Sequence, residues 1–188
     1  MISTFCLKGL EIQTGDILCT TSGGEPLQPG QFWRLLGSLV PGEVDHVAVY
    51  VGPGGRCVEA ALKGVAIFDL PDEHWSTDQM SEQRGNFVDR LVGIAYPLTG
   101  RGLSLDDQNH IREAVGTYCL AQVGKPYNLN FLDSEAEWGF YCSQLPYKAY
   151  KRCGIDLNTG QEVPNLPGTR SIIFPQEIWS GCSHKRVE

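Results

Sequence analysis

The sequence has no long apolar run and no recognisable leader at its amino end. No segment approaches the roughly 18 apolar residues that a membrane-spanning helix needs. The chain opens with MISTFCLKGLEIQTGD, where no basic stretch is followed by an apolar one, so a secretory signal peptide is not predicted. We therefore expect a soluble, cytoplasmic protein without a transmembrane segment. Export by a machinery that reads no signal peptide is compatible with the same sequence.

Positive charge is scarce. The 188 residues carry 15 Lys and Arg against 22 Asp and Glu, which gives a formal net charge of −7 at pH 7. Binding to a nucleic-acid backbone needs a basic surface, and so does electrostatic anchoring to an anionic membrane. We expect no nucleic-acid partner, and the sequence leaves the oligomeric state open.

Closely spaced cysteines are also missing. The seven Cys residues include no CxxC pair and their number is odd, which argues against a disulfide scaffold and against a zinc site. Most of them are expected to be small buried thiols. The glycine-rich segment TTSGGEP, residues 20–26, lacks the Gly-Lys-Ser/Thr of a phosphate-binding loop. We expect neither a metal nor a cofactor.

The sequence does contain a mixture of β-rich and helical segments that suits one domain over residues 1–188. Two β-rich runs flank the turn GPGG and read as a hairpin. We predict an α+β fold in which helices pack on a small antiparallel sheet or barrel. The predicted strands span residues 14–22, 44–52, 56–62, 64–70 and 91–96, and the predicted helices span residues 31–40, 104–124 and 142–154.

The helix over residues 104–124 has the clearest end signals. Ser104 is a candidate N-cap, acidic residues follow it in the first turn, and Gly124 is a suitable C-terminal stop. The spacing of its apolar residues predicts which of them face the core. They are Ile111, Ala114, Val115, Tyr118 and Ala121.

Cys142 opens the last of these helices, in the segment FYCSQLPYKAYKRCG. The first four N–H groups of a helix have no intrahelical partner, so Pro146 is tolerated in the first turn and places the helix start close to Cys142. A thiol at this end lies in the positive part of the helix dipole, which favours thiolate, and free backbone N–H groups there can hold an oxyanion. Cys153 lies at the opposite end, where the dipole disfavours thiolate. We therefore expect Cys142 to be the nucleophile.

A nucleophilic cysteine needs a base, and the chain has four histidines. His46 lies in the apolar run VDHVAVYVG, on a predicted strand. His74 and His184 fall in expected loops, and His110 lies on a helix. His46 is thus our candidate base, although a histidine inside a strand is also compatible with a purely structural role.

Glu59 is the candidate third member of a triad. If GPGG forms a four-residue loop, Val51 pairs with Arg56. Glu59 then lies opposite Ala48, on the same face as His46 and diagonal to it, within reach of the imidazole. A carboxylate in this place orients the imidazole and stabilises its charged form. A loop one residue shorter or longer would turn Glu59 to the other face of the hairpin.

Four segments, taken together and in this order, resemble the circularly permuted branch of the NlpC-type papain-like superfamily, and most of all its YiiX/YebB-like group. They are GDIL, DHVAVYVGPGGRCVEA, GKPYN and FYCSQL. The resemblance covers residues 14–154 with gaps, and FPQEIW is similar to the closing segment of the family. It implies a papain-like core in which the histidine strand precedes the cysteine helix. It also implies a triad that falls here on Cys142, His46 and Glu59.

The same resemblance implies hydrolysis or transfer at an amide or ester acyl group. Our main expectation is a cysteine peptidase or amidase that cleaves a small or cell-wall-type peptide through a thioester. Relatives of this branch also include lipid acyltransferases akin to lecithin retinol acyltransferase, so acyl transfer or acyl hydrolysis on a lipid is the alternative. A third possibility, from another class, is a non-catalytic ligand-binding module on the same fold.

The residues around the nucleophile supply candidates for binding. We expect the oxyanion to be held by the Cys142 N–H and a second donor. Tyr127, in GKPYN, is the candidate for that donor or for a substrate contact, and a merely packed loop aromatic is the open alternative. Ser143 and Tyr141, on either side of the nucleophile, are further candidates for oxyanion or substrate binding.

The chain departs from the family at the start of the cysteine helix. The group usually reads Cys-Ser-Glu-Leu followed by an aliphatic residue, whereas this chain reads CSQLP. Gln144 and Pro146 leave the triad intact. They remove the basis for transferring substrate contacts from the first turn of that helix.

Overall fold

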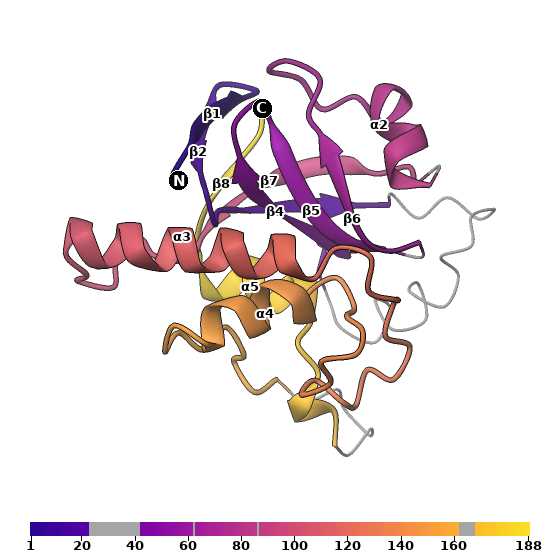
Figure 1. The fold of residues 1–188 in the computed structure, drawn as a ribbon, viewed down its shortest axis with the longest axis vertical. Helices are drawn as coiled ribbons and strands as arrows, with labels where there is room; N and C mark the ends of the chain where they lie inside the picture. Colours follow the sequence, from indigo (N-terminus) through magenta and orange to yellow (C-terminus); the bar gives the residue numbers. More distant parts are fainter. Residues whose placement is uncertain (23–41, 62, 86, 162–167) are drawn as a thin grey trace.

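The computed structural model describes residues 1–22, 42–61, 63–85, 87–161 and 168–188. Within these ranges the chain has the predicted α+β architecture, with helices packed on an antiparallel sheet (Figure 1). The expected helix over residues 31–40 and the glycine-rich loop before it lie outside the described residues.

Six strands form one antiparallel sheet in the order β6-β5-β4-β3-β7-β8, and β1 and β2 form a separate hairpin. The five predicted strands are confirmed as β3 to β7. The first hairpin and the edge strand β8 were not predicted. The strands are β1 (Thr4–Leu7), β2 (Leu10–Gln13), β3 (Ile17–Thr21), β4 (His46–Gly52), β5 (Arg56–Ala61), β6 (Gly64–Asp69), β7 (Arg90–Tyr96) and β8 (Ser183–Arg186).

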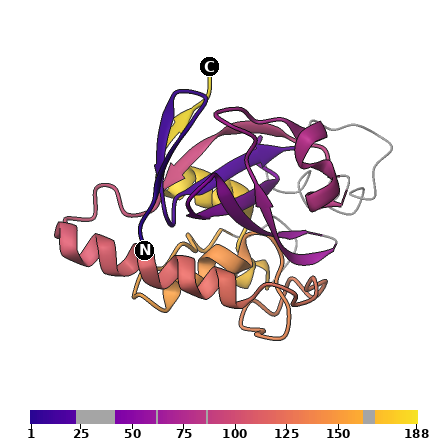
Figure 2. The ribbon, with the colours of Figure 1, turned by 45° about the horizontal axis from the view of Figure 1, so that its top comes forward.

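The two faces of the large sheet pack against different layers (Figures 1 and 2). One face forms a core with helices α3, α4 and α5. The other forms a second core with the β1–β2 hairpin and α2. None of the described helices is long and apolar enough to cross a membrane. The helices are α2 (Thr77–Arg84), α3 (Leu105–Ala121), α4 (Gln144–Lys151) and α5 (Pro175–Gly181), with a short 3-10 turn, η1 (Thr169–Ser171).

The predicted N-cap of α3 is confirmed, because the Ser104 hydroxyl accepts a hydrogen bond from the Asp107 N–H at 3.1 Å. The predicted core-facing side of this helix is only partly right. Val115 is buried, but Ala114 and Ala121 are exposed. Ile111 and Tyr118 are partly buried against the core.

The buried side of α3 differs from the prediction because of one polar contact and one close backbone approach. Arg112 is buried because its guanidinium donates to the Thr14 carbonyl and to Asp16, both at 2.8 Å. Gly116 faces inward because α3 approaches Thr14 so closely that a Cβ would meet its methyl group. A pattern of apolar residues does not predict that Arg112 or Gly116 is buried. The buried side of α3 is therefore rotated relative to the predicted one.

Candidate active site

Cys142 lies in the turn that leads directly into α4, and it is almost fully buried at 2% exposure. The Leu145 N–H donates to the Tyr141 carbonyl at 3.3 Å, so a helical hydrogen bond already spans Cys142. Pro146 is the third residue of the helix, where its missing N–H costs nothing. Helix α4 begins at Gln144, two residues after the start predicted at Cys142, and it ends at Lys151, so Cys153 lies beyond the opposite end.

The hairpin of β4 and β5 is confirmed, but its turn differs from the expected four-residue loop. Arg56 pairs with Gly52 and not with Val51. The predicted pair of Val51 with Arg56 is therefore wrong, and the loop between paired residues has only three members, residues 53–55. By itself, a loop shorter by one residue would turn Glu59 away from His46.

A β-bulge between Tyr50 and Gly52 restores the expected register. A bulge places one extra residue in one strand of the pair, so it compensates for the shorter loop. Beyond it, Val49 pairs with Val58. In this register Glu59, the residue after Val58, lies on the same side of the sheet as His46, as predicted.

The structure brings the three predicted triad residues together. His46 begins β4, and its Nε2 lies 2.7 Å from Oε2 of Glu59 on β5. The imidazole is also hydrogen-bonded to the side chain of Cys142. Because Nε2 faces the carboxylate, Nδ1 is the nitrogen left for the thiol. The ring of Phe87 packs against the imidazole with 4.8 Å between centroids, which restricts its orientation.

The charges of this group depend on one another. Burial alone would lower the pKa of His46, but its hydrogen bonds to Cys142 and Glu59 and the negative charge of Glu59 outweigh burial and raise it to about 10. Burial would raise the pKa of Glu59, but the positive charge of Arg84 and the hydrogen bond from His46 lower it to about 2. The carboxylate is thus ionised at neutral pH and favours a charged imidazolium.

Arg84 and Asp89 complete the surroundings of Glu59, and neither was predicted from the sequence. The Arg84 guanidinium donates to both carboxylate oxygens of Glu59, at 2.9 and 2.8 Å. It also donates to both oxygens of Asp89, at 2.7 and 2.9 Å. A usable signal was the four-residue spacing of Met80 and Arg84, which places both on the buried side of α2.

Tyr127 lies beside Cys142. The backbone N–H of Cys142 donates a hydrogen bond to the Tyr127 hydroxyl oxygen, at the place where we expected an oxyanion to bind. Burial raises the pKa of Tyr127 well above its usual range, so the phenol keeps its proton near neutral pH. Its ring makes an edge contact with Phe131 at 6.5 Å between centroids.

The position of Tyr127 is fixed by backbone pairing between its own segment and the one before Cys142. Phe140 N–H donates to the Pro126 carbonyl at 3.2 Å, and Asn128 N–H donates to the Phe140 carbonyl at 3.1 Å. The two segments approach so closely that a Cβ on Gly139 would stand 2.7 Å from the Pro126 carbonyl oxygen. The GKPYN and GFYC segments therefore act as one unit that holds the phenol against Cys142.

Tyr141 and Ser143, the other two candidates for binding, both contact the backbone of Ile173. The Ser143 hydroxyl donates to the Ile173 carbonyl at 2.6 Å, and the Tyr141 hydroxyl accepts from the Ile173 N–H at 3.3 Å. Both residues are 1% exposed. These bonds tie the start of α4 to the segment that leads into α5.

Gln144, where the chain departs from the family that it resembles, is completely buried. Its Oε1 accepts from Asn128 Nδ2 at 3.1 Å and from the Tyr141 N–H at 3.2 Å. Its Nε2 donates to the carbonyls of Asp133, Ser134 and Ala136, at 3.3, 3.1 and 3.2 Å. The amide thus connects the first turn of α4 with the loop over residues 128–140.

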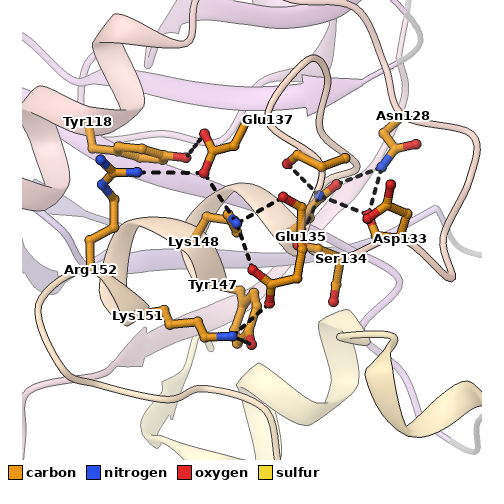
Figure 3. A network of polar contacts seen from close by, with 12 residues as sticks. Tyr118, Asn128, Asp133, Ser134, Glu135, Glu137, Tyr147, Lys148, Lys151 and Arg152 are labelled. Atoms are coloured by element: carbon orange, nitrogen blue, oxygen red, sulfur yellow. Dashed lines mark hydrogen bonds and ion pairs between the residues drawn. The ribbon is translucent and has the colours of Figure 1, made fainter.

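Charged side chains secure the same loop along the outer side of α4 (Figure 3). Glu135 forms ion pairs with Lys148 and Lys151, at 3.0 and 2.7 Å. Glu137 pairs with Lys148 at 3.2 Å and with Arg152 at 3.6 Å. Exposed ion pairs contribute little to stability one by one, so this cluster acts mainly by fixing the course of the loop.

The other three histidines lie away from this centre. His74 and His110 are exposed, and His184 stacks on Trp179 with 4.0 Å between ring centroids. Within the described ranges, no group of three or more His, Cys, Asp or Glu side chains is arranged to hold a metal ion. No family model, no curated protein and no solved structure matches this chain significantly.

Proposed function

We propose that this chain is a cysteine hydrolase that cleaves an amide bond in a small or cell-wall-type peptide, on a permuted NlpC-type papain-like core. The single observation that supports this proposal is the hydrogen-bonded series from the Cys142 thiol through the His46 imidazole to the ionised carboxylate of Glu59. The turn that leads into α4 carries the Cys142 thiol, and the β4–β5 hairpin carries the imidazole and the carboxylate. Nucleophile, base and orienting group in such a series are the parts that thiol acyl transfer requires.

In the acylation step, His46 takes the thiol proton and the sulfur of Cys142 attacks the carbonyl carbon of the substrate. The C–S bond forms as the carbonyl π electrons move to oxygen. We expect the Tyr127 phenol, whose oxygen accepts from the Cys142 N–H, to donate its own proton to that oxygen. When the intermediate collapses, the C–N bond breaks and the imidazolium gives its proton to the leaving amine.

In the deacylation step, His46 accepts a proton from water and the hydroxide attacks the thioester carbon. The C–S bond breaks, the acid product leaves, and the proton returns to the sulfur. Glu59 holds the imidazole orientation through both steps and stabilises each imidazolium.

A lipid acyl group is the second candidate substrate, favoured by the exposed side chains near Tyr127. Leu129 is 67% exposed and Leu132 is 60% exposed, both on the loop that follows the phenol. Exposed leucines on this loop suit an acyl chain. The acyl-enzyme distinguishes the two substrates, because cell extract incubated with the protein and quenched in acid gives a Cys142 adduct whose mass is peptidyl or fatty acyl. A peptidyl mass contradicts the lipid candidate, and a fatty-acyl mass contradicts the peptidase.

The first test of the proposed function is alkylation by iodoacetamide at pH 6. An ordinary thiol is only about 0.3% thiolate at this pH, so a thiolate paired with imidazolium is expected to react about 100-fold faster. Peptide mapping by mass spectrometry follows Cys142 and the half-buried Cys153 in the same sample. We expect His46→Ala to remove the advantage of Cys142. Equal rates at both cysteines in the native protein would contradict catalysis and favour a ligand-binding module.

Tyr127→Phe tests the oxyanion contact. We expect acylation of Cys142 by p-nitrophenyl acetate to fall about 10- to 100-fold, because one donor to the tetrahedral oxyanion is lost. Alkylation by iodoacetamide forms no oxyanion and is expected to change less than about twofold. Tyr118→Phe, whose hydroxyl contacts Glu137 on the surface, is the matched control. Equal losses in both reactions would show that Tyr127 only packs.

A further inference from the structure

The segment between β6 and β7 makes an excursion over the Glu59 end of the hairpin. It contains α2, a polar helix in which only Met80 and Arg84 are buried. Such a helix contributes little apolar area to the core. Its main structural role is to place the Arg84 guanidinium against Glu59. The Arg84 side chain is 0% exposed.

The buried guanidinium of Arg84 has hydrogen-bond acceptors on two carboxylates and aromatic rings packed around it. Four N–H···O bonds join it to Glu59 and Asp89, two to each carboxylate. The rings of Phe68, Trp75 and Phe87 lie 4.7, 5.0 and 5.1 Å from the guanidinium carbon. Such planar, bidentate pairing is specific to arginine.

One atom connects this cluster to the proposed chemistry. Oε2 of Glu59 accepts from Arg84 Nη2 at 2.8 Å and lies 2.7 Å from His46 Nε2. The carboxylate therefore cannot rotate toward or away from the imidazole without breaking its bonds to Arg84. Phe87 contacts both the imidazole and the guanidinium, so it packs the two against each other.

We propose that Arg84 is a positioning residue of the active centre: held by Asp89, it keeps Glu59 ionised and aimed at His46. This inference rests on the proposed role of Cys142, His46 and Glu59. A replaceable structural ion pair would need neither the shared oxygen nor the connection to the imidazole.

The electrostatic consequence has a definite sign. Glu59 faces His46 from β4 and Arg84 from α2, with Cys57 on its own strand and Asp89 behind the guanidinium. Without the guanidinium, two buried carboxylates would share one site with no cation between them. Such a pair takes up a proton at higher pH than a single exposed carboxyl group. The imidazolium would then lose its anion, and the reactive form of Cys142 would appear only at higher pH.

The experiment is the pH profile of Cys142 alkylation by iodoacetamide between pH 4 and 9. For Arg84→Gln we expect the midpoint of the profile to rise by about one pH unit or more, and for Arg84→Lys by a smaller amount, since lysine keeps the charge without the bidentate geometry. Arg112→Gln is the matched control, because it removes the other arginine that is buried among the described residues, which pairs with Asp16. It is expected to lower stability and leave the midpoint unchanged.

Each outcome bears on the inference. An unchanged midpoint in Arg84→Gln, or an equal rise in Arg112→Gln, would overturn it while leaving the proposed function standing. A native Cys142 with no enhanced reactivity at pH 6 would overturn both. If Arg84→Gln does not fold, Arg84→Lys decides the question, because it retains the charge without the bidentate pairing and an upward midpoint is required.

Discussion

Replacing Glu59 with Gln is expected to slow alkylation of Cys142 at pH 6 by about 100-fold or more, with little change in shape at the site. A neutral amide provides no charge to stabilise the imidazolium. Whichever way the amide points, its NH₂ group meets either the Arg84 donors or His46 Nε2. In the second orientation Nε2 must accept, which places the imidazole proton on Nδ1, where the thiol needs an acceptor.

The same substitution also removes one partner from a buried ion pair, which costs about 3–5 kcal/mol of stability. The pKa of Glu59 is about 2, below its ordinary value, so its contribution is present above about pH 4.5 and is lost as the pH falls toward 2. The pKa of His46 is raised to about 10, so its contribution is complete below about pH 6.5 and is lost as the pH rises toward 10. Urea unfolding is therefore expected to show the widest gap between native protein and variant at pH 5–7, and a smaller gap at pH 3.

Asp69→Asn is the control for Glu59→Gln. Asp69 on β6 forms an ion pair with Arg56 on β5, the strand that also carries Glu59, but its side chain is 43% exposed. We expect less than about 1 kcal/mol of destabilisation and no change in alkylation. If Glu59→Gln loses stability but Cys142 keeps its reactivity at pH 6, Glu59 is a structural carboxylate and the triad is wrong.

The parts of the site that the sequence predicted are those with a local signal. Pro146 restricts where α4 can begin, and two β-rich apolar runs around the turn GPGG predict the two strands that carry His46 and Glu59. The register shows the limit of such reasoning. Glu59 lies on the expected face only because a shorter loop is combined with a bulge near Val51. The sequence GPGG does not indicate either the loop length or the bulge.

The parts that the prediction missed are held mainly by contacts between distant segments with weak local signals. Arg84 sits in a helix without an apolar stripe, and its partner Glu59 lies 25 residues earlier in the chain. The edge strand β8 has the sequence SHKR and no apolar residue to reveal it. Gln144 reads as one more polar residue near a helix start, and only the folded loop shows that five groups converge on its amide.

Gln144→Glu is expected to destabilise the protein by about 2–4 kcal/mol at pH 7, although it restores the residue usual in the resembled family. The glutamate would keep the oxygen that accepts from Asn128 and Tyr141. In place of the NH₂ group it would put a second carboxylate oxygen against three carbonyls that lie 3.1 to 3.3 Å from Nε2. The loop over residues 128–140 would have to open, and Tyr127, which is paired into it, would move with it.

The pH dependence separates this mechanism from a simple loss of packing. A glutamate facing three carbonyls has its pKa raised above the unfolded value of about 4.3, so the protonated form is the one that suits the folded chain. The cost of the variant is therefore small below about pH 4 and grows as the pH rises through the raised value. Gln122→Glu is the control, since its Nε2 donates to a single carbonyl, that of Tyr118, and a cost near 1 kcal/mol is expected in urea unfolding. A cost for Gln144→Glu that is no larger than the control, or that does not change between pH 4 and 8, would show that the loop accommodates a carboxylate and that the departure from the family has no structural consequence.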